Sequence, residues 1–210
     1  MLVLRDNRFE SSGFPEEIFV VDETRVQIPC STCGRSWVGW NDGTTIRVRG
    51  ARKWPDILYI GTMSIVSLRV AGLLRPHCGN HVSFHPMALE RAAKTAPEYL
   101  DVRIRYSGLK PNVDETTGCE FGGNEQLVSM RELGACVECL KCRSGKFFDV
   151  KRLVLAGSPP RCGDLHRIGV FMLATNDLVR RLLEARVTNL YFQLPENAGN
   201  RSLESLRVVP

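Results

Sequence analysis

The chain has 210 residues, of which 43% are hydrophobic and 24% are charged, an ordinary composition for a soluble globular protein. A chain of this length can bury a hydrophobic core without a disulfide or a metal to hold it together. Its net charge of +5, from 28 basic and 23 acidic side chains, suits an acidic protein partner or a nucleic acid and proves neither.

No segment has the pattern of a targeting or membrane-spanning sequence. The N-terminal MLVLRDNRFE lacks the apolar stretch and cleavage site of a signal peptide, and the longest apolar run, at 56–74, is interrupted by Gly, Ser, Asp and Arg. We therefore expect a cytoplasmic protein with no membrane partner. In that reducing compartment, eight cysteines that include CxxC pairs indicate metal binding in place of disulfides.

Strands dominate the first half of the chain. Residues 17–29 are rich in β-branched side chains, and NDG at 41–43 indicates a hairpin turn between two strand-like segments. The basic run IRVRGARK at 46–53 alternates apolar and charged residues, so we interpret it as a solvated strand face.

A weak internal repeat relates 65–84 to 173–192 at a constant offset of 108 residues. Each copy begins with an apolar strand end and a hydroxyl residue, Ser67 or Thr175, that can cap a helix. Apolar residues at helical spacing follow, and a polar turn then leads into a short strand. The repeat predicts two related strand–helix–strand units, with short helices near 67–75 and 175–186.

The clearest strand lies at 96–108, after the first copy of the repeat. One face carries Leu100, Val102, Ile104 and Tyr106, and the other carries Asp101, Arg103 and Arg105. This alternation predicts a sheet with one face on the core and the other in water.

The loop at 114–126, rich in Gly and polar residues, is the best boundary between two lobes. We predict an N-terminal lobe at 1–113 and a C-terminal lobe at 114–210, each with one CxxC knuckle, together forming one compact domain. The predicted fold class is α+β: antiparallel sheets with a few short helices, the two related units being joined by a structural zinc site.

The first cysteine pair lies in PCSTCG. Structural zinc takes four tetrahedral ligands, usually thiolates, and two residues between paired cysteines let both sulfurs reach one ion. Cys30 and Cys33 have this spacing, and Gly34 permits the tight backbone of a knuckle.

The second segment, CVECLKC, offers two alternative pairs. Either Cys136 and Cys139 or Cys139 and Cys142 can complete the site. Gly145 follows the latter pair closely, so we favour Cys139 and Cys142, with Cys136 as a spare or substitute. We thus predict one structural Zn²⁺ bound by the four cysteines Cys30, Cys33, Cys139 and Cys142.

Other cysteines and histidines give weaker signals. A thioredoxin-like site needs a helix that starts at its CxxC pair, whereas strand-like residues follow Cys33. In HCGNHVSFH, a strand would place His81 and His85 about 13 Å apart at ~3.3 Å per residue, too far to share an ion. Cys119 and Cys162 lie singly in loops and receive no role.

The sequence contains no phosphate-binding glycine loop, nucleophile elbow, paired-carboxylate motif or HExxH motif. This favours a binding protein over an enzyme.

Four motifs occur in a familiar order: CSTCG at 30–34, APEYLDVRIRYSGLKPN at 96–112, CLKC at 139–142, and a tail at 164–197 that contains LATNDLVRRLLEARVTNLYF. From about Val26 to Glu196, with gaps, this order resembles the myxobacterial double-CXXCG motif family. The family's cysteines fall on Cys30, Cys33, Cys139 and Cys142, whereas Arg143 stands where the family has Gly and Cys136 adds a thiol.

The resemblance implies a function, because the family includes Sit-type immunity proteins that protect a cell from a kin-delivered toxin. The leading hypothesis is a cytoplasmic immunity protein that binds and neutralises a cognate protein toxin. The alternative is a zinc-ribbon nucleic-acid-binding or regulatory module, favoured by the net charge, the run at 46–53, and Trp37, Trp40 and Trp54. Nucleic-acid binding would weaken steeply with salt, because neutralising phosphates releases counterions.

Overall fold

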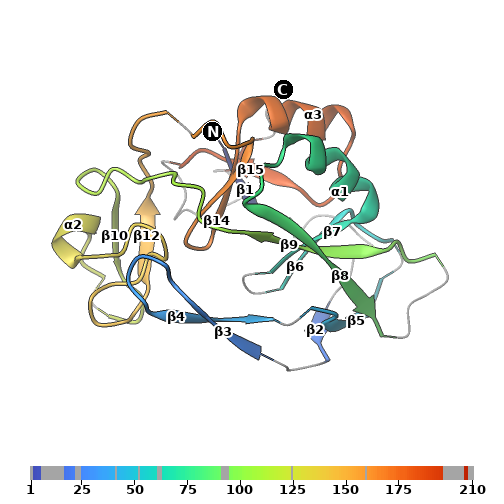
Figure 1. Cartoon of the computed structure of the whole chain (residues 1–210), viewed down its shortest axis with the longest axis horizontal. Helices are drawn as coiled ribbons and strands as arrows, with labels where there is room; N and C mark the ends of the chain where they lie inside the picture. The colour runs from blue at the N-terminus through green and yellow to red at the C-terminus, as the bar shows by residue number, and fades with distance from the viewer. Residues whose placement is uncertain are drawn as a thin grey trace.

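The computed structural model describes residues 2–5, 17–21, 25–40, 42–51, 53–60, 63–90, 95–123, 125–158, 160–195 and 206–207. Within these residues the fold is mainly β-sheet with three short α-helices (Figure 1), which confirms the predicted α+β class. No helix in the described part of the chain has the length and apolar character needed to cross a membrane.

The largest sheet has the strand order β2-β5-β8-β9-β7-β6. Its neighbours are antiparallel apart from β5 and β8, which are parallel. The strands are β2 (Glu17–Val20), β5 (Thr45–Arg49), β6 (Ile57–Ile60), β7 (Met63–Ser67), β8 (Val82–Leu89) and β9 (Tyr99–Ile104).

A second sheet has the order β13-β14-β1-β15-β16 and is antiparallel throughout. Its strands are β1 (Leu2–Arg5), β13 (Leu165–Ile168), β14 (Phe171–Ala174), β15 (Tyr191–Gln193) and β16 (Leu206–Arg207).

Two smaller sheets and the helices complete the fold. The three-stranded sheet has the order β11-β10-β12, and β3 and β4 form a separate hairpin. The remaining elements are β3 (Arg25–Pro29), β4 (Ser36–Trp40), β10 (Thr117–Glu120), β11 (Val128–Ser129), β12 (Phe148–Arg152), α1 (Leu68–Leu74), α2 (Met130–Leu133), α3 (Asn176–Glu184) and the 3₁₀ turn η1 (Arg75–His77).

The two large sheets contain the same four-strand unit. The order β6-β7-β9-β8 in one matches β13-β14-β1-β15 in the other, and α1 follows β7 as α3 follows β14. Ile57 pairs with Val66 in the first unit and Leu165 pairs with Ala174 in the second, so the register agrees with the offset of 108 residues. The predicted pair of strand–helix–strand units is confirmed.

The caps of the two helices follow the same repeat. Ser67 Oγ accepts a hydrogen bond from the amide three residues on and donates one to Asp56 at 2.9 Å. Thr175 Oγ1 does the same with Asp164, also at 2.9 Å. The backbone amides of Ser67 and Thr175 donate to the carbonyls of these same aspartates. Since aspartate, cap and pairing all recur at one offset, chance similarity does not explain the repeat.

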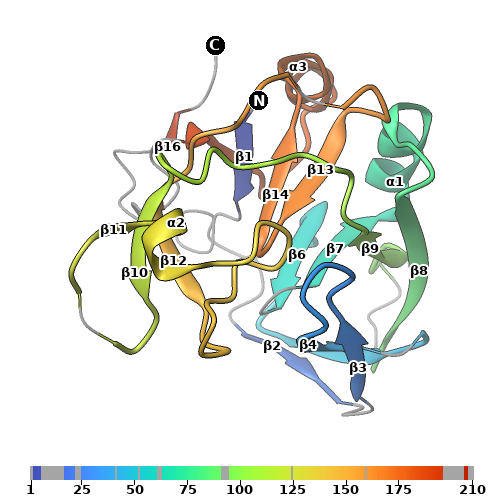
Figure 2. The same cartoon turned by 60° about the vertical axis from the view of Figure 1, so that its left-hand side comes forward.

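The units are docked through their helices, which lie side by side in Figures 1 and 2. Both helices bury apolar side chains in one core cluster, namely Val70, Ala71 and Leu74 of α1 and Leu178, Val179 and Leu182 of α3. In addition, β1 lies within the predicted N-terminal lobe but pairs with β14 and β15 of the C-terminal one. The chain thus crosses the predicted lobe boundary more than once.

The polar face predicted for the strand at 96–108 is not a simple solvent face. Asp101 is only 4% exposed and accepts a hydrogen bond from Arg103 at 2.8 Å. Asp42 pairs with both Arg103, at 2.7 Å, and His85, at 2.8 Å. Burial raises the pKa of Asp101, and Arg103 and His85 oppose this rise. This face of β9 is an ion-pair network covered by the turn that carries Asp42.

The equivalence of the two caps leads to a prediction for Thr175. Thr175→Ala removes the hydroxyl that caps α3 and binds Asp164, so the free energy of unfolding should fall by about 1 kcal/mol. Thr175→Ser retains the oxygen and should stay near wild type. Urea denaturation measures both variants, and equal stabilities would contradict a capping role.

Asp56 should make stability depend on acid pH. Burial acts to raise its pKa, but hydrogen bonds from Arg69, Thr188 and Ser67 outweigh burial and hold the pKa below its ordinary value of 3.8. The ionised carboxylate therefore stabilises the fold above that value, and this contribution is lost as the pH falls through the lowered pKa. Unfolding of Asp56→Asn should depend less on pH in this acid range than unfolding of wild type. Glu125→Gln, at an exposed position, makes the same charge change as a control, and an unchanged pH dependence in Asp56→Asn would refute the assignment.

Candidate metal centre

The first CxxC pair lies in the loop that joins β3 to β4. The Cys30 amide donates to the carbonyl of Arg35 at 2.8 Å, and the Gly34 amide donates back to the Cys30 carbonyl at 2.9 Å. Gly34 has φ +70°, a left-handed conformation that glycine adopts without strain. This closed turn holds Cys30 and Cys33 on one side of the hairpin end.

The second pair occupies a turn with the same hydrogen bonds. The Cys136 amide donates to the carbonyl of Lys141 at 2.8 Å, and the Leu140 amide donates to the Cys136 carbonyl at 3.0 Å. Leu140, at the position of Gly34, also has a positive φ, of +52°. Cys136 and Cys139 are therefore the structural counterparts of Cys30 and Cys33.

The two turns bring four thiols together. The sulfurs of Cys30, Cys33, Cys136 and Cys139 all lie within 4.8 Å of one another. Cys30 Sγ lies 3.8 Å from Cys136 Sγ, and Cys33 Sγ lies 3.6 Å from Cys139 Sγ. Four thiolates at about 2.3 Å from a tetrahedral ion are about 3.8 Å apart, whereas a disulfide needs about 2.05 Å. This cluster could hold a metal ion.

Cys136 takes the place that the sequence analysis gave to Cys142. The Cys142 thiol lies outside the cluster, 2.6 Å from Ser144 Oγ. The turn that begins at Cys142 also differs. There the Gly145 amide donates to the carbonyl three residues earlier, whereas in the turns at Cys30 and Cys136 the amide donates to the carbonyl four residues earlier. Proximity to a glycine was thus the wrong signal for choosing the second pair.

Packing explains how a leucine can occupy the left-handed position of the second turn. Leu140 is 2% exposed and belongs to a core cluster with Ile168 and Phe171. It packs onto Gly169, where an added Cβ would lie 2.6 Å from the leucine side chain. Burial of this large apolar side chain offsets the strain of its positive φ.

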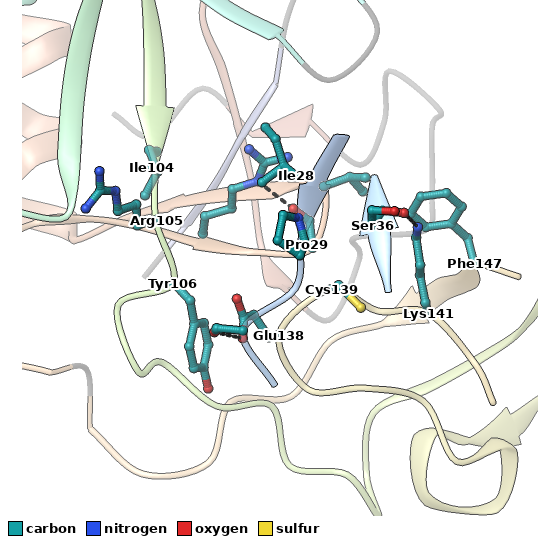
Figure 3. A pocket seen from close by; sticks show the side chains of 14 residues that line it. Ile28, Pro29, Ser36, Ile104, Arg105, Tyr106, Glu138, Cys139, Lys141 and Phe147 are labelled. Atoms are coloured by element: carbon teal, nitrogen blue, oxygen red, sulfur yellow. Dashed lines mark hydrogen bonds between the residues drawn. The ribbon is translucent and has the colours of Figure 1, made fainter. Parts of the chain in front are cut away.

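Polar contacts also tie the two turns together, independently of any metal (Figure 3). The Glu138 carboxylate accepts hydrogen bonds from the hydroxyls of Ser31 and Thr32, each at 2.6 Å. Lys141 donates to the carbonyl of Ser36. Burial acts to raise the pKa of Glu138, but the hydrogen bonds from Ser31, Thr32 and Cys30 outweigh it and lower the pKa. The ionised carboxylate is therefore built into the contact.

The surroundings of the Cys139 thiol disfavour its ionisation. Burial raises the pKa of Cys139, and its neighbours Cys33 and Cys136 raise it further. A bound metal ion would reverse this preference, because coordination deprotonates a thiol. The geometry and the donor type therefore both fit a thiolate-bound metal.

A cavity of about 750 Å³ lies beside the cluster. The β3–β4 hairpin, the end of β9, the second cysteine turn and the tip of the β13–β14 hairpin line it (Figure 3). Phe147 and Val170 line it while remaining 41% and 51% exposed. The Tyr106 ring lies next to Glu138 in the cavity wall. Sequence reasoning did not find this cavity, because it forms where four separate segments meet.

Three of the residues that favoured nucleic-acid binding, Arg47, Arg49 and Trp54, contact other side chains of the protein. Arg47 of the basic run pairs with Glu90, and Arg49 lies 3.7 Å from Glu17. The ring of Trp54 packs near that of Tyr99, with 6.4 Å between the two ring centroids. The side chains of Trp37 and Trp40 and all of Arg52 lie outside the described residues.

Comparison with known proteins adds no assignment. No protein-family model matches the chain, and no curated protein matches it. The resemblance to the double-CXXCG family remains a prediction.

Replacement of single cysteines tests which thiols bind metal. Cys136→Ser should weaken binding at the cluster by at least about tenfold, because it removes a ligand. Cys142→Ser should leave binding unchanged. Titration with Co²⁺ gives the measurement, since thiolate-to-cobalt charge-transfer absorption reports the number of sulfur ligands. If Cys142→Ser weakened binding and Cys136→Ser did not, Cys142 would be the ligand in place of Cys136.

Proposed function

We propose that this protein is a cytoplasmic immunity protein that binds and neutralises a cognate bacterial toxin, with a structural Zn²⁺ at the four-cysteine cluster. The observation that carries this proposal is the position of the cluster. Its two turns form part of the wall of a mainly apolar cavity bordered by exposed hydrophobic side chains. A metal there would make a recognition surface rigid.

Zinc is the metal that suits this donor set. Thiolates select Zn²⁺ among the common divalent ions, and four cysteines around one ion form a closed tetrahedral site with no position open to substrate. Two of the four residues, Cys30 and Cys139, are only 2% and 3% exposed. The proposed role of the metal is therefore to hold the two turns together and not to catalyse a reaction.

The cavity has the composition of a protein-binding site. Phe147 and Val170 offer apolar surface that a partner side chain would bury, as anchor residues do at interface centres. Arg105 is exposed at the cavity, and Lys141 lies in its wall over the ring of Phe147 at 5.2 Å. These cations favour an acidic loop of the toxin, since complementary charge speeds encounter and selects the partner.

The contacts of the basic run support a protein partner over a nucleic acid. Arg47 and Arg49 are each directed at a carboxylate of a neighbouring segment, which leaves less of their charge for phosphates. Trp54 is packed in a core cluster and does not stand as a stacking platform. We therefore propose a protein partner, and the co-expression experiment below also tests the alternative of nucleic-acid binding.

Co-expression with the proposed cognate toxin, which we expect to be encoded beside this protein, gives the test. Cells should survive toxin production only with this protein present, and the purified pair should co-elute. Val170→Asp should weaken the complex by about tenfold or more, a loss of about 1.4 kcal/mol or more, because it places a charge in the apolar contact.

Leu68→Asp is the matched control for Val170→Asp. Leu68 is 45% exposed, close to the 51% of Val170, but it lies on α1 and does not line the cavity. Its variant should protect cells as well as wild type does. Equal protection by both variants would remove the cavity from the interface. Survival without this protein, together with salt-sensitive nucleic-acid binding, would support the nucleic-acid module.

A further inference from the structure

A second group of metal-binding side chains lies where the two repeat units meet. His81 precedes β8 in the first unit, while Cys162 and His166 flank the start of β13 in the second. One ligand atom from each of these three residues lies within 4.8 Å of the others. None of them belongs to the four-cysteine cluster.

Two glycines allow this close approach. A Cβ on Gly79 would lie 1.7 Å from the carbonyl oxygen of Cys162 and 3.0 Å from Nδ1 of His81. A Cβ on Gly163 would lie 2.6 Å from the amide nitrogen of Gly79. The loops before β8 and β13 therefore pack backbone against backbone, and this contact places the cysteine beside the histidines.

Hydrogen bonds set the orientation of both imidazole rings. Nε2 of His81 lies 2.7 Å from the carbonyl oxygen of Leu165, which can only accept, so Nε2 carries the proton of the neutral ring and Nδ1 carries the lone pair. Nδ1 of His166 lies 2.8 Å from Ser107 Oγ, so its proton can be donated there, with the lone pair on Nε2. Metal-bound histidines are held in this way, through a hydrogen bond from the other nitrogen.

One nitrogen of each ring has no hydrogen-bond partner in the described structure. Nδ1 of His81 and Nε2 of His166 are buried atoms without a hydrogen bond in the described structure, and His166 as a residue is 0% exposed. The two rings stack, with 5.6 Å between their centroids. Buried polar atoms are nearly always satisfied, so these two nitrogens need a partner from outside the chain, either a water molecule or an ion.

The repeat provides an internal comparison. Asn189, the counterpart of His81, donates from its amide to the carbonyl of Ile57 at 2.7 Å, as His81 donates to Leu165. The counterparts of Cys162 and His166 are Trp54 and Leu58, which belong to an apolar core cluster. Of the two equivalent sets, only the one formed by His81, Cys162 and His166 therefore consists of metal-binding residues.

We propose that Nδ1 of His81, Nε2 of His166 and Sγ of Cys162 bind a second Zn²⁺ ion. Two imidazoles and one thiolate are suitable zinc ligands, and three protein ligands leave a fourth coordination position for water or a small ligand. This donor set differs from the closed set of four cysteines. The ion would also join the two units directly, because its ligands come from both.

Zinc stoichiometry of the full-length, reduced protein tests this site. Wild type should bind two Zn²⁺ per chain in a competition titration with a chromophoric chelator. Cys162→Ser should bind one. His81→Asn should also bind one, and it copies Asn189, so it keeps the hydrogen bond to Leu165 and guards against loss of the fold. Cys78→Ser, in the same loop but outside both groups, is the control and should bind two.

A second readout separates this site from the cysteine cluster. In Co²⁺-loaded protein, Cys162→Ser should remove the spectrum of a site with one sulfur and leave that of the four-thiolate site, whereas Cys136→Ser should do the opposite. Loaded wild type should also protect Cys162 from alkylation. One Zn²⁺ in wild type, with no loss in Cys162→Ser or His81→Asn and no protection of Cys162, would overturn the proposal and leave a water between two histidines. Neither result depends on the toxin, so this site and the proposed function stand or fall separately.

Discussion

The contact between the two cysteine turns is the constraint on which the candidate site depends. It joins segments 106 residues apart in the chain, and neither turn could position four thiols without the other. The carboxylate of Glu138, held by Ser31 and Thr32, aligns the turns before any metal is considered. A metal would then bind to a preformed set of ligands and not assemble it, which lowers the entropy lost on binding. Residues of the same contact, including Ser31 and Glu138, also line the adjacent cavity.

The duplicated unit explains much of the remaining architecture. Each copy buries one helix face, and the two faces bury each other in a shared core. The aspartates Asp56 and Asp164 lie outside that core, yet each fixes the start of a helix through a side-chain and a backbone hydrogen bond. The two units agree in strand order and pairing register, and they differ at positions such as Trp54 and its counterpart Cys162.

Local patterns predicted the parts of the fold that depend on local physics. Helices α1 and α3 followed from apolar spacing and from the caps Ser67 and Thr175, because a helix start is specified within a few residues. Three of the clustered cysteines followed from pair spacing. For the fourth, pair spacing allowed both Cys136 and Cys142, and a nearby glycine favoured Cys142. The turn at Cys136 instead has Leu140 with a positive φ, a conformation that packing against Gly169, far along the chain, permits. The burial of Asp101 and the meeting of His81 with His166 depend equally on docking between distant segments.

The place of β1 has a consequence for how the chain is made. In the second unit this strand occupies the position that β9 holds in the first, and it pairs with residues 173–174 and 191–193. Residues 2–5 are therefore synthesised long before the strands with which they pair. The first unit has all four of its strands by Ile104 and can fold during synthesis, whereas the second closes only after its last strands emerge. Pairing over such a separation is slow, so the earlier half would serve as the template on which the later half is completed.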